Sequence, residues 1–418
     1  MTSTAYSYPL VSKLPREDAD EELTLNYFPR EITAKGGQLV QRRLQLRDML
    51  VPDVRVAEDF RCRAVIDYVE VEIDSQYNNF TTRDLIVEKC GESVWVEACA
   101  PTISNSRGLY TFAARIQDPD RRQLNELFGS GNSLSAILKP LSRTSLREIE
   151  VSVDFFPKDQ SDEGRERMVG LLARHYLPSS TMMTDDPNTA MRSLRRTGSY
   201  QPRRRSPAVV RIDQTFPALN DRETPIARDP WENNLRVDRT VAIGDRNADA
   251  YVNIDNKVTN IRNPSKGTFE DLAPEERRSR IEVTLKRPAL EELGLTEVSQ
   301  LSRFPFQKLR EPFFDFRLPT VPVDFETNHL GSMDRWPHER DLINVFLNMG
   351  IATYQREQLR HREVQKLARR KASAAGAPEA DWPELQLASP SHSTNMVAYA
   401  DLNSKIFEAL RSLSERER

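Results

Sequence analysis

The stretch Ala64-Val-Ile-Asp-Tyr-Val-Glu-Val-Glu-Ile73 decides how the fold of this 418-residue chain is interpreted. Its apolar and acidic residues alternate with a period of two, which predicts a β-strand with one buried and one polar face. Residues 81–90 start with a helix-favouring threonine and end before Gly91, as a short helix does. Residues 94–99 predict a second strand, so the fold begins as strand, helix, strand.

Two more strands and a helix complete this unit. Residues 109–116 predict the third strand, and residues 149–156 predict the fourth. Between them, Asp118-Pro119 resembles an N-cap followed by proline at the first helical position, so we expect a helix at 118–129. The resulting order, β-α-β-β-α-β, is the split βαβ arrangement of ferredoxin-like domains. The fold class predicted is therefore α+β.

The composition indicates a folded centre with polar attachments. Only 38% of residues are hydrophobic, 29% are charged, and 26 prolines outnumber 15 glycines. We expect five regions: a polar N-terminal arm at 1–60 with a short helix at 38–50, the first half of the domain at 61–177, a basic Pro/Ser/Arg-rich and disordered insertion at 178–236, a second α/β half at 237–320, and a helical C-terminal extension at 321–418.

Further elements are expected inside these regions. A helix is predicted at 162–176 and a final amphipathic helix at 398–413. In the second half, the sequence predicts a hairpin of strands at 239–246 and 249–255, a strand at 280–286, and a helix at 288–293 that Gly294 ends.

Several classes of protein lack their usual markers in this sequence. No apolar run is long enough for a transmembrane helix, and the start shows no secretory signal. The three cysteines have no CxxC spacing, so we expect reduced thiols and a cytoplasmic protein without a membrane partner. The five histidines form no HExxH motif, which disfavours a zinc site. The absence of GxxxxGK[ST], GxGxxG and GxSxG disfavours nucleotide hydrolysis, dinucleotide binding and a serine hydrolase.

Acidic residues on predicted strands are the strongest candidates for chemistry. Glu148, Glu150 and Asp154 are spaced by two and four, so they project from one face of a strand. Glu282 lies in the middle of another strand. Gathered carboxylates repel one another unless a cation compensates, and hard oxygen ligands suit Mg²⁺ or Mn²⁺. Two interpretations stay open: a metal site formed by Glu150, Asp154 and Glu282, or the solvent face of a sheet.

The insertion at 178–236 is rich in arginine, although the net charge of the chain is −3. Clustered arginines bind phosphates and release counterions, which would give DNA affinity without sequence specificity. A solvated linker in which charge prevents aggregation is the alternative. The arginines concerned are Arg195, Arg196, Arg203, Arg204 and Arg205, and Tyr200 lies between the two clusters.

Four segments carry a resemblance to a known family. They are Glu150-Val-Ser-Val-Asp154-Phe, Gly244-Asp-Arg246, Tyr251-Val-Asn-Ile-Asp-Asn-Lys257 and Arg280-Ile-Glu-Val-Thr-Leu-Lys-Arg287. Their order and spacing resemble rolling-circle replication initiators of the plasmid Rep_trans and phage replication-initiation-factor type. There the pattern is roughly Asp-Leu-Ala-Phe-Asp-Phe, Gly-x-Arg, Arg-Ile-Tyr-Asn-Lys and Arg-x-Glu-x-x-Leu-Lys. The resemblance covers about 64–157 and 237–320.

The resemblance implies an activity and partners. In that family a tyrosine attacks a DNA phosphodiester and forms a covalent 5′-phosphotyrosine with a free 3′-OH, which conserves the bond energy for religation. It implies Mg²⁺ or Mn²⁺ as the cofactor, an origin region and a host helicase as partners, and a homodimer. The residues it implies are Glu150, Asp154 and Glu282 for the metal or acid site, Lys257 near the phosphate, and Arg246 and Arg280 for DNA contact.

The expected nucleophile is displaced in this sequence. Aligning the segment that ends at Lys257 on Arg-Ile-Tyr-Asn-Lys places Asp255 where the family has its tyrosine. Tyr251 lies four residues earlier on the same strand face, which is more than about 10 Å away at about 3.4 Å per residue. Three explanations stay open: Tyr251 or another tyrosine such as Tyr200 acts, the alignment is shifted, or nicking is lost.

The function predicted is a DNA-binding replication initiation protein that nicks one strand at an origin through a tyrosine and a divalent metal. Two alternatives remain. One is a catalytically inactive DNA-binding or regulatory protein on the same scaffold, and the other is a phage structural or assembly protein.

Overall fold

A computed structural model of the chain describes residues 6–10, 23–32, 47–90, 94–98, 110–119, 145–178, 199–200, 240–243, 248–263, 268–322 and 396–416, with single helical positions between 343 and 374. The predicted helix at 118–129 therefore lies outside the described residues beyond Pro119. Of the basic insertion, only Ser199 and Tyr200 are described, and they pair with Ala242 and Val241.

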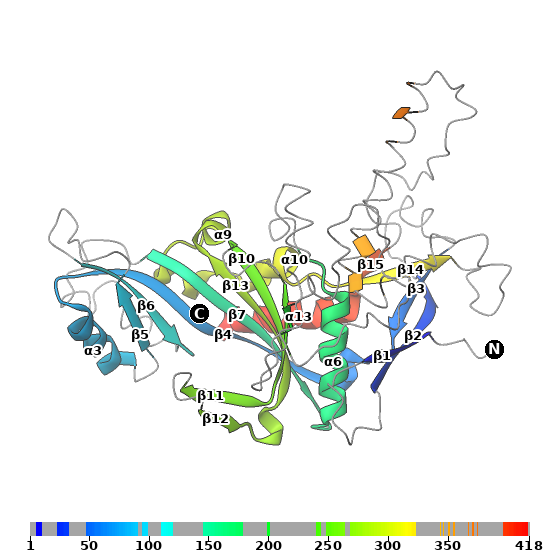
Figure 1. Ribbon diagram of the computed structural model, residues 1–418, viewed down its shortest axis with the longest axis horizontal. Coiled ribbons are helices and arrows are strands. Elements are labelled where there is room, and N and C mark those ends of the chain that lie inside the picture. Colours follow the sequence, from blue (N-terminus) through cyan, green and yellow to red (C-terminus); the bar gives the residue numbers. More distant parts are fainter. Residues whose placement is uncertain are drawn as a thin grey trace.

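An antiparallel eight-stranded sheet forms the centre of the molecule (Figure 1). Its strands follow the order β5-β6-β4-β7-β13-β10-β9-β8. Their bounds are β4 Phe60–Ser75, β5 Val94–Ala98, β6 Tyr110–Gln117, β7 Ser145–Pro157, β8 Ser199–Tyr200, β9 Thr240–Ile243, β10 Ala250–Lys257 and β13 Arg278–Lys286. These elements confirm the strands expected from alternation in both halves of the domain, including the hairpin that β9 and β10 form.

The first four strands lie in the neighbour order β5-β6-β4-β7, and each pairs with the next antiparallel. In chain order these are the second, third, first and fourth strands. Helix α3 (Asn79–Cys90) connects β4 to β5 and packs on β5 and β6, which confirms the helix predicted there. Together with the other helices, these antiparallel strands make the fold α+β.

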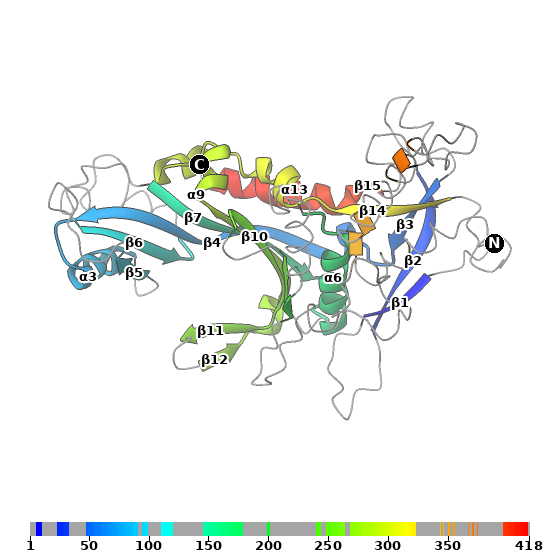
Figure 2. The same cartoon turned by 45° about the horizontal axis from the view of Figure 1, so that its top comes forward.

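Helices cover one face of this sheet and leave the other open (Figure 2). Helices α6 (Asp162–His175) and α13 (Ala400–Arg416) confirm two predictions and pack against the strands. The sheet face beneath them is apolar, with Val151, Val153 and Val283 completely buried. Burying such a side chain stabilises the fold by about 1.5–3 kcal/mol. Most of the stability of the sheet therefore comes from this face.

Short elements connect the larger ones. Helix α9 (Arg287–Glu292) follows β13, as predicted, and Gly294 ends it with a positive φ of 70°. The remaining elements are α2 Val56–Asp59, β11 Thr259–Asn263, β12 Thr268–Asp271, η2 Pro274–Glu276, η3 Val298–Arg303, η4 Phe306–Leu309 and α10 Arg310–Phe313.

A second sheet joins the two ends of the chain. It has the order β1-β2-β3-β14-β15. The strands are β1 Tyr6–Leu10, β2 Leu23–Glu31, β3 Arg47–Pro52, β14 Arg317–Pro322 and β15 Met396–Ala398. Two expectations are corrected here. The polar arm contains strands, and residues 47–50 of the expected helix at 38–50 lie in β3, because pairing with β2 and β14 outweighs the local leucine spacing.

His175 connects α6 to this second sheet. Its Nδ1 lies 2.7 Å from the carbonyl oxygen of Arg317, and its Nε2 lies 3.1 Å from the Tyr27 hydroxyl. Because a carbonyl only accepts, Nδ1 carries the hydrogen and Nε2 accepts from Tyr27. Burial lowers the pKa of His175 to about 3, so the ring is neutral in the folded protein. His175 is thus a structural residue.

Candidate active site on the polar face of the sheet

The strand register brings polar side chains from four strands into rows across the open face. Glu150 on β7 is the cross-strand partner of both Tyr68 on β4 and Thr284 on β13. Thr284 in turn pairs with Tyr251 on β10. These four residues, Tyr68, Glu150, Thr284 and Tyr251, form what we call the tyrosine row. It contains residues that are up to 183 positions apart in the sequence (68 to 251).

A β-bulge adds Asp67 to this face. The pairing of β4 with β7 shifts register between Ile66 and Tyr68, so Asp67 is the extra residue. A bulge redirects a side chain, and such features are frequent beside functional sites. The sequence carried a signal for it, because the apolar positions change phase between Ile66 and Val69. The prediction of a site from Glu150, Asp154 and Glu282 had missed Asp67.

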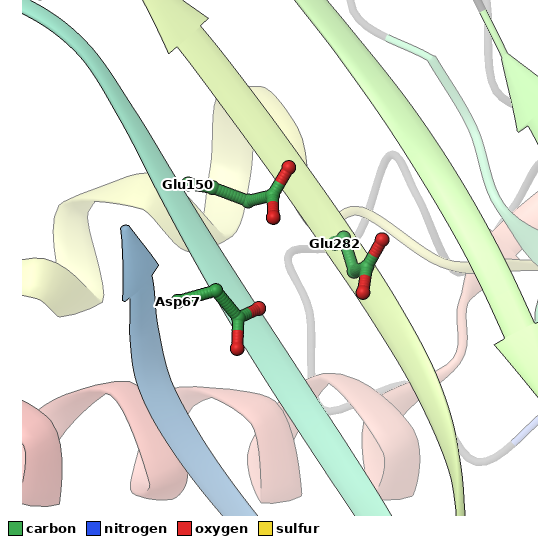
Figure 3. A group of neighbouring side chains, drawn as sticks. All are labelled: Asp67, Glu150 and Glu282. Atoms are coloured by element: carbon green, nitrogen blue, oxygen red, sulfur yellow. The ribbon is translucent and has the colours of Figure 1, made fainter. Parts of the chain in front are cut away.

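Asp67, Glu150 and Glu282 form a carboxylate trio on the polar face (Figure 3). One carboxylate oxygen from each lies within 4.8 Å of the others, and all three side chains are half-buried. They come from β4, β7 and β13, and α13 lies behind the sheet in the same view. Three hard oxygen donors at this spacing fit a divalent cation such as Mg²⁺ or Mn²⁺.

Asp154 does not belong to the trio. Its two oxygens accept from Nε and Nη2 of Arg280 at 2.5 and 2.9 Å, because Arg280 lies directly opposite on β13. Arg278 approaches the same carboxylate at 3.1 Å. Asp154 is 3% exposed, so its charge is balanced by arginines inside the protein.

Arg280 is also placed differently from the prediction of a DNA contact. It is 4% exposed, which leaves no surface for a DNA backbone to reach. Its Nη1 donates to Asp67 at 2.7 Å and lies 3.6 Å from Glu282. The Ser152 hydroxyl donates to the other oxygen of Asp67. Arg280 therefore holds the trio in place from within.

The trio carries unrelieved repulsion. Burial raises the pKa of Glu150, and the neighbouring charge of Glu282 raises it further. Burial also raises the pKa of Glu282, although Arg280 opposes the shift. Both carboxyls thus hold protons at a higher pH than ordinary glutamates do. A bound divalent cation would favour the ionised forms.

Tyr251 lies beside this trio. Thr284 donates from Oγ1 to Oε2 of Glu150 at 2.7 Å, and the Tyr251 side chain hydrogen-bonds both Thr284 and Tyr68. The Tyr68 hydroxyl donates to Glu148. Burial raises the pKa of Tyr251, and these hydrogen bonds oppose the shift. The distance between Tyr251 and Asp255 along β10 therefore does not separate Tyr251 from the acids, because the trio lies beside the Tyr251 end.

The chain matches no known family. The sequence fits no protein-family model and no curated protein. None of the helices that the structure describes is long and apolar enough to span a bilayer.

The remaining predicted residues have varied placements. Asp255 is 3% exposed and pairs with Arg280 across the strands. Lys257 is half-buried and pairs with Arg278. The other predicted DNA-binding residues lie outside the described part of the chain; they are Arg195, Arg196, Arg203, Arg204, Arg205 and Arg246.

One further acid near the trio was missed by sequence reasoning. Asp118 follows β6 with a φ of 44°, a left-handed conformation that aspartate tolerates better than most residues. Its backbone N–H donates to the Asp67 carbonyl at 2.7 Å. Burial raises the pKa of Asp118, and the charge of Asp67 adds to this shift. In the sequence it had been interpreted only as a helix cap.

Proposed function

We propose that this chain is a DNA-binding replication initiation protein of a plasmid or phage, which nicks one DNA strand through Tyr251. One observation carries the proposal: a tyrosine hydroxyl and three carboxylates meet on the open face of one sheet. The hydroxyl is held by Thr284, which also holds Glu150 of the trio. Such a pairing of nucleophile and cation-binding acids suits phosphoryl transfer.

The proposed step balances as a transesterification. The Tyr251 oxygen forms a bond to phosphorus while the bond from phosphorus to O3′ breaks. The tyrosine loses its proton and the leaving O3′ gains one, so the products are a 5′-phosphotyrosine and a free 3′-OH. Asp67, Glu150 and Glu282 would hold Mg²⁺ or Mn²⁺, which polarises a phosphate and stabilises its developing charge. Arg280 keeps Asp67 oriented within the trio.

The finer description of the fold belongs to the same proposal. We assign β4, α3, β5, β6 and β7 to a split βαβ, ferredoxin-like unit, and the neighbour order β5-β6-β4-β7 supports this assignment. The family resemblance of the sequence supports an origin region and a host helicase as partners, a homodimer, and a cytoplasmic location.

The test is strand cleavage of supercoiled plasmid that carries the cognate origin, in Mg²⁺ or Mn²⁺. We expect a covalent adduct at the 5′ end, and we expect Tyr251→Phe to abolish it. Tyr110→Phe is the matched control, since Tyr110 is 40% exposed and lies on β6 away from the trio. Wild-type protein that forms no adduct with its own origin would overturn the nicking proposal.

A second candidate is a DNA-binding protein without cleavage on the same scaffold. The observation that favours it is Arg280, whose guanidinium already contacts Asp67 and lies near Glu282. If this candidate is correct, the origin is bound without an adduct, and Mn²⁺ does not change the thermal stability of the protein.

A further inference from the structure

A row of cations crosses four adjacent strands at one end of the polar face. Arg61 on β4 pairs with Phe156 on β7, and Arg278 on β13 pairs with Lys257 on β10. Because Ser279 pairs with Phe155, Arg278 lies level with Phe156. We call Arg61, Phe156, Arg278 and Lys257 the basic row.

Phe156 holds two guanidinium groups of this row. The Arg61 guanidinium carbon lies 5.0 Å from the ring centroid, and that of Arg278 lies 5.8 Å from it. At these distances an arginine is attracted to the ring, and its N–H donors stay free for an anion. Phe156 thus limits the positions that both arginines adopt.

The positive charge of this region exceeds what the protein itself neutralises. Arg61 and Arg63 are exposed, and neither makes an ion pair with the residues that the structure describes. Arg278 and Lys257 face each other directly, and like charges in that position destabilise a sheet. Only Arg278 has a carboxylate partner, Asp154. An arrangement of this kind indicates an anionic ligand.

The basic row lies along the strands from the carboxylate trio. Arg278 and Glu282 are four residues apart on β13, which is about 14 Å at about 3.4 Å per residue. The hairpin of β11 and β12 continues from β10 and leads into β13 at the end that carries Lys257 and Arg278. Figure 2 draws this hairpin on the side of the sheet opposite α13, which is the side of the polar face.

We propose that the basic row and Arg63 bind the phosphate backbone of single-stranded DNA next to the carboxylate trio. The proposal rests on the proposed function and names the form of DNA that the site receives. A single line of positive charge matches one backbone. The second strand of a duplex would lie against the acidic rows, where like charge opposes it. A single strand can follow the basic row and approach the trio with one phosphate.

The test measures binding of a fluorescently labelled oligothymidine to the full chain by anisotropy, over a salt series and in EDTA. EDTA prevents metal-dependent cleavage, so binding is read alone. Arg61→Ala with Arg63→Ala removes two exposed charges, and we expect about tenfold weaker binding. The slope of log affinity against log salt should become shallower by about 1.4, at roughly 0.7 per phosphate contact on single strands.

The matched control is Arg303→Ala with Arg411→Ala. Both are exposed arginines, on η3 and on α13, away from the basic row. This variant should bind like the wild type, with an unchanged salt slope. Phe156→Leu keeps an apolar side chain but removes the ring, and we expect binding to weaken about two- to fivefold.

Two results would overturn the inference. One is a double variant at Arg61 and Arg63 with wild-type affinity and salt slope. The other is tighter binding of duplex DNA or single-stranded RNA than of single-stranded DNA. Failure of the proposed function looks different: the wild type then binds the oligonucleotide through the basic row but never forms an adduct with its origin.

Discussion

The two faces of the eight-stranded sheet use the same strands for opposite purposes. On the covered face, Val151, Val153 and Ile281 are completely buried beneath the helices. On the open face, the neighbouring residues Glu150 and Glu282 lie among charges that repel them. The comparison shows that alternation lets one strand stabilise the fold on one side while it holds strained electrostatics on the other.

Within the open face, neutralised and unneutralised acids lie side by side. Asp154 is balanced by Arg280 and Arg278, whereas Glu150 and Glu282 share no arginine of their own comparable to that pair. Only the second kind of acid offers free oxygens to a cation. Four predictions test how far these regions differ.

The largest effect is expected from Arg280→Met. It leaves the buried charge of Asp154 unpaired, so we expect a loss of about 3–5 kcal/mol in the free energy of unfolding. Urea denaturation measures it, with Arg411→Met as the exposed control. Adding Asp154→Leu should recover much of the loss. A cost of less than about 0.5 kcal/mol would mean that the open face is an ordinary solvated surface.

The second prediction concerns the junction at His175. Its folded pKa is lowered to about 3, so the unfolded chain takes up the proton first as the pH falls below about 6.5. Stability is therefore fully present above that pH and decreases on acidification, by about 2 kcal/mol at pH 5. Guanidinium denaturation at pH 7 and pH 5 measures the change. His175→Gln should remove this part of the pH dependence, and an unchanged dependence would contradict the assignment.

The third prediction concerns the trio and has the opposite sign. The pKa values of Glu150 and Glu282 are raised, so the folded state binds protons more tightly than the unfolded chain. Without metal, stability should decrease as the pH rises above about 4.5, by at most about 1.4 kcal/mol per pH unit for each carboxyl. Glu282→Gln should flatten this decrease.

Mn²⁺ or Mg²⁺ should raise the melting temperature of the wild type at pH 8 and should have less effect on Glu282→Gln. Glu292→Gln is the control, because Glu292 is exposed on α9. Equal metal effects on all three proteins would argue against a cation at the trio.

The smallest change in stability is expected from Thr284→Val. Valine matches the shape of threonine but removes the hydroxyl that donates to Glu150. We expect a loss of about 1 kcal/mol, measured by urea denaturation. Adduct formation should decrease more than stability does, because Tyr251 loses a hydrogen-bond partner. A variant with unchanged adduct formation would separate Thr284 from the reaction.

The sequence by itself determined the strands of the central sheet and several helices. Alternation at 64–73, 149–156 and 280–286 reports which side chains face a core, and that is a local property of each strand. The same reasoning identified Glu150, Glu282 and Tyr251 as candidate site residues. The strands of the N-terminal region were not predicted, because β3 depends on partners at 23–31 and 317–322.

Only the tertiary structure decided which of these residues meet. The register between strands places Tyr251 beside Glu150 and pairs Arg280 with Asp154, and a bulge brings Asp67 into the trio. Register is a relation between strands far apart in the chain, and a shift of one residue would turn every side chain to the other face. No local pattern in one strand contains that information, so the acids were visible in the sequence but their grouping was not.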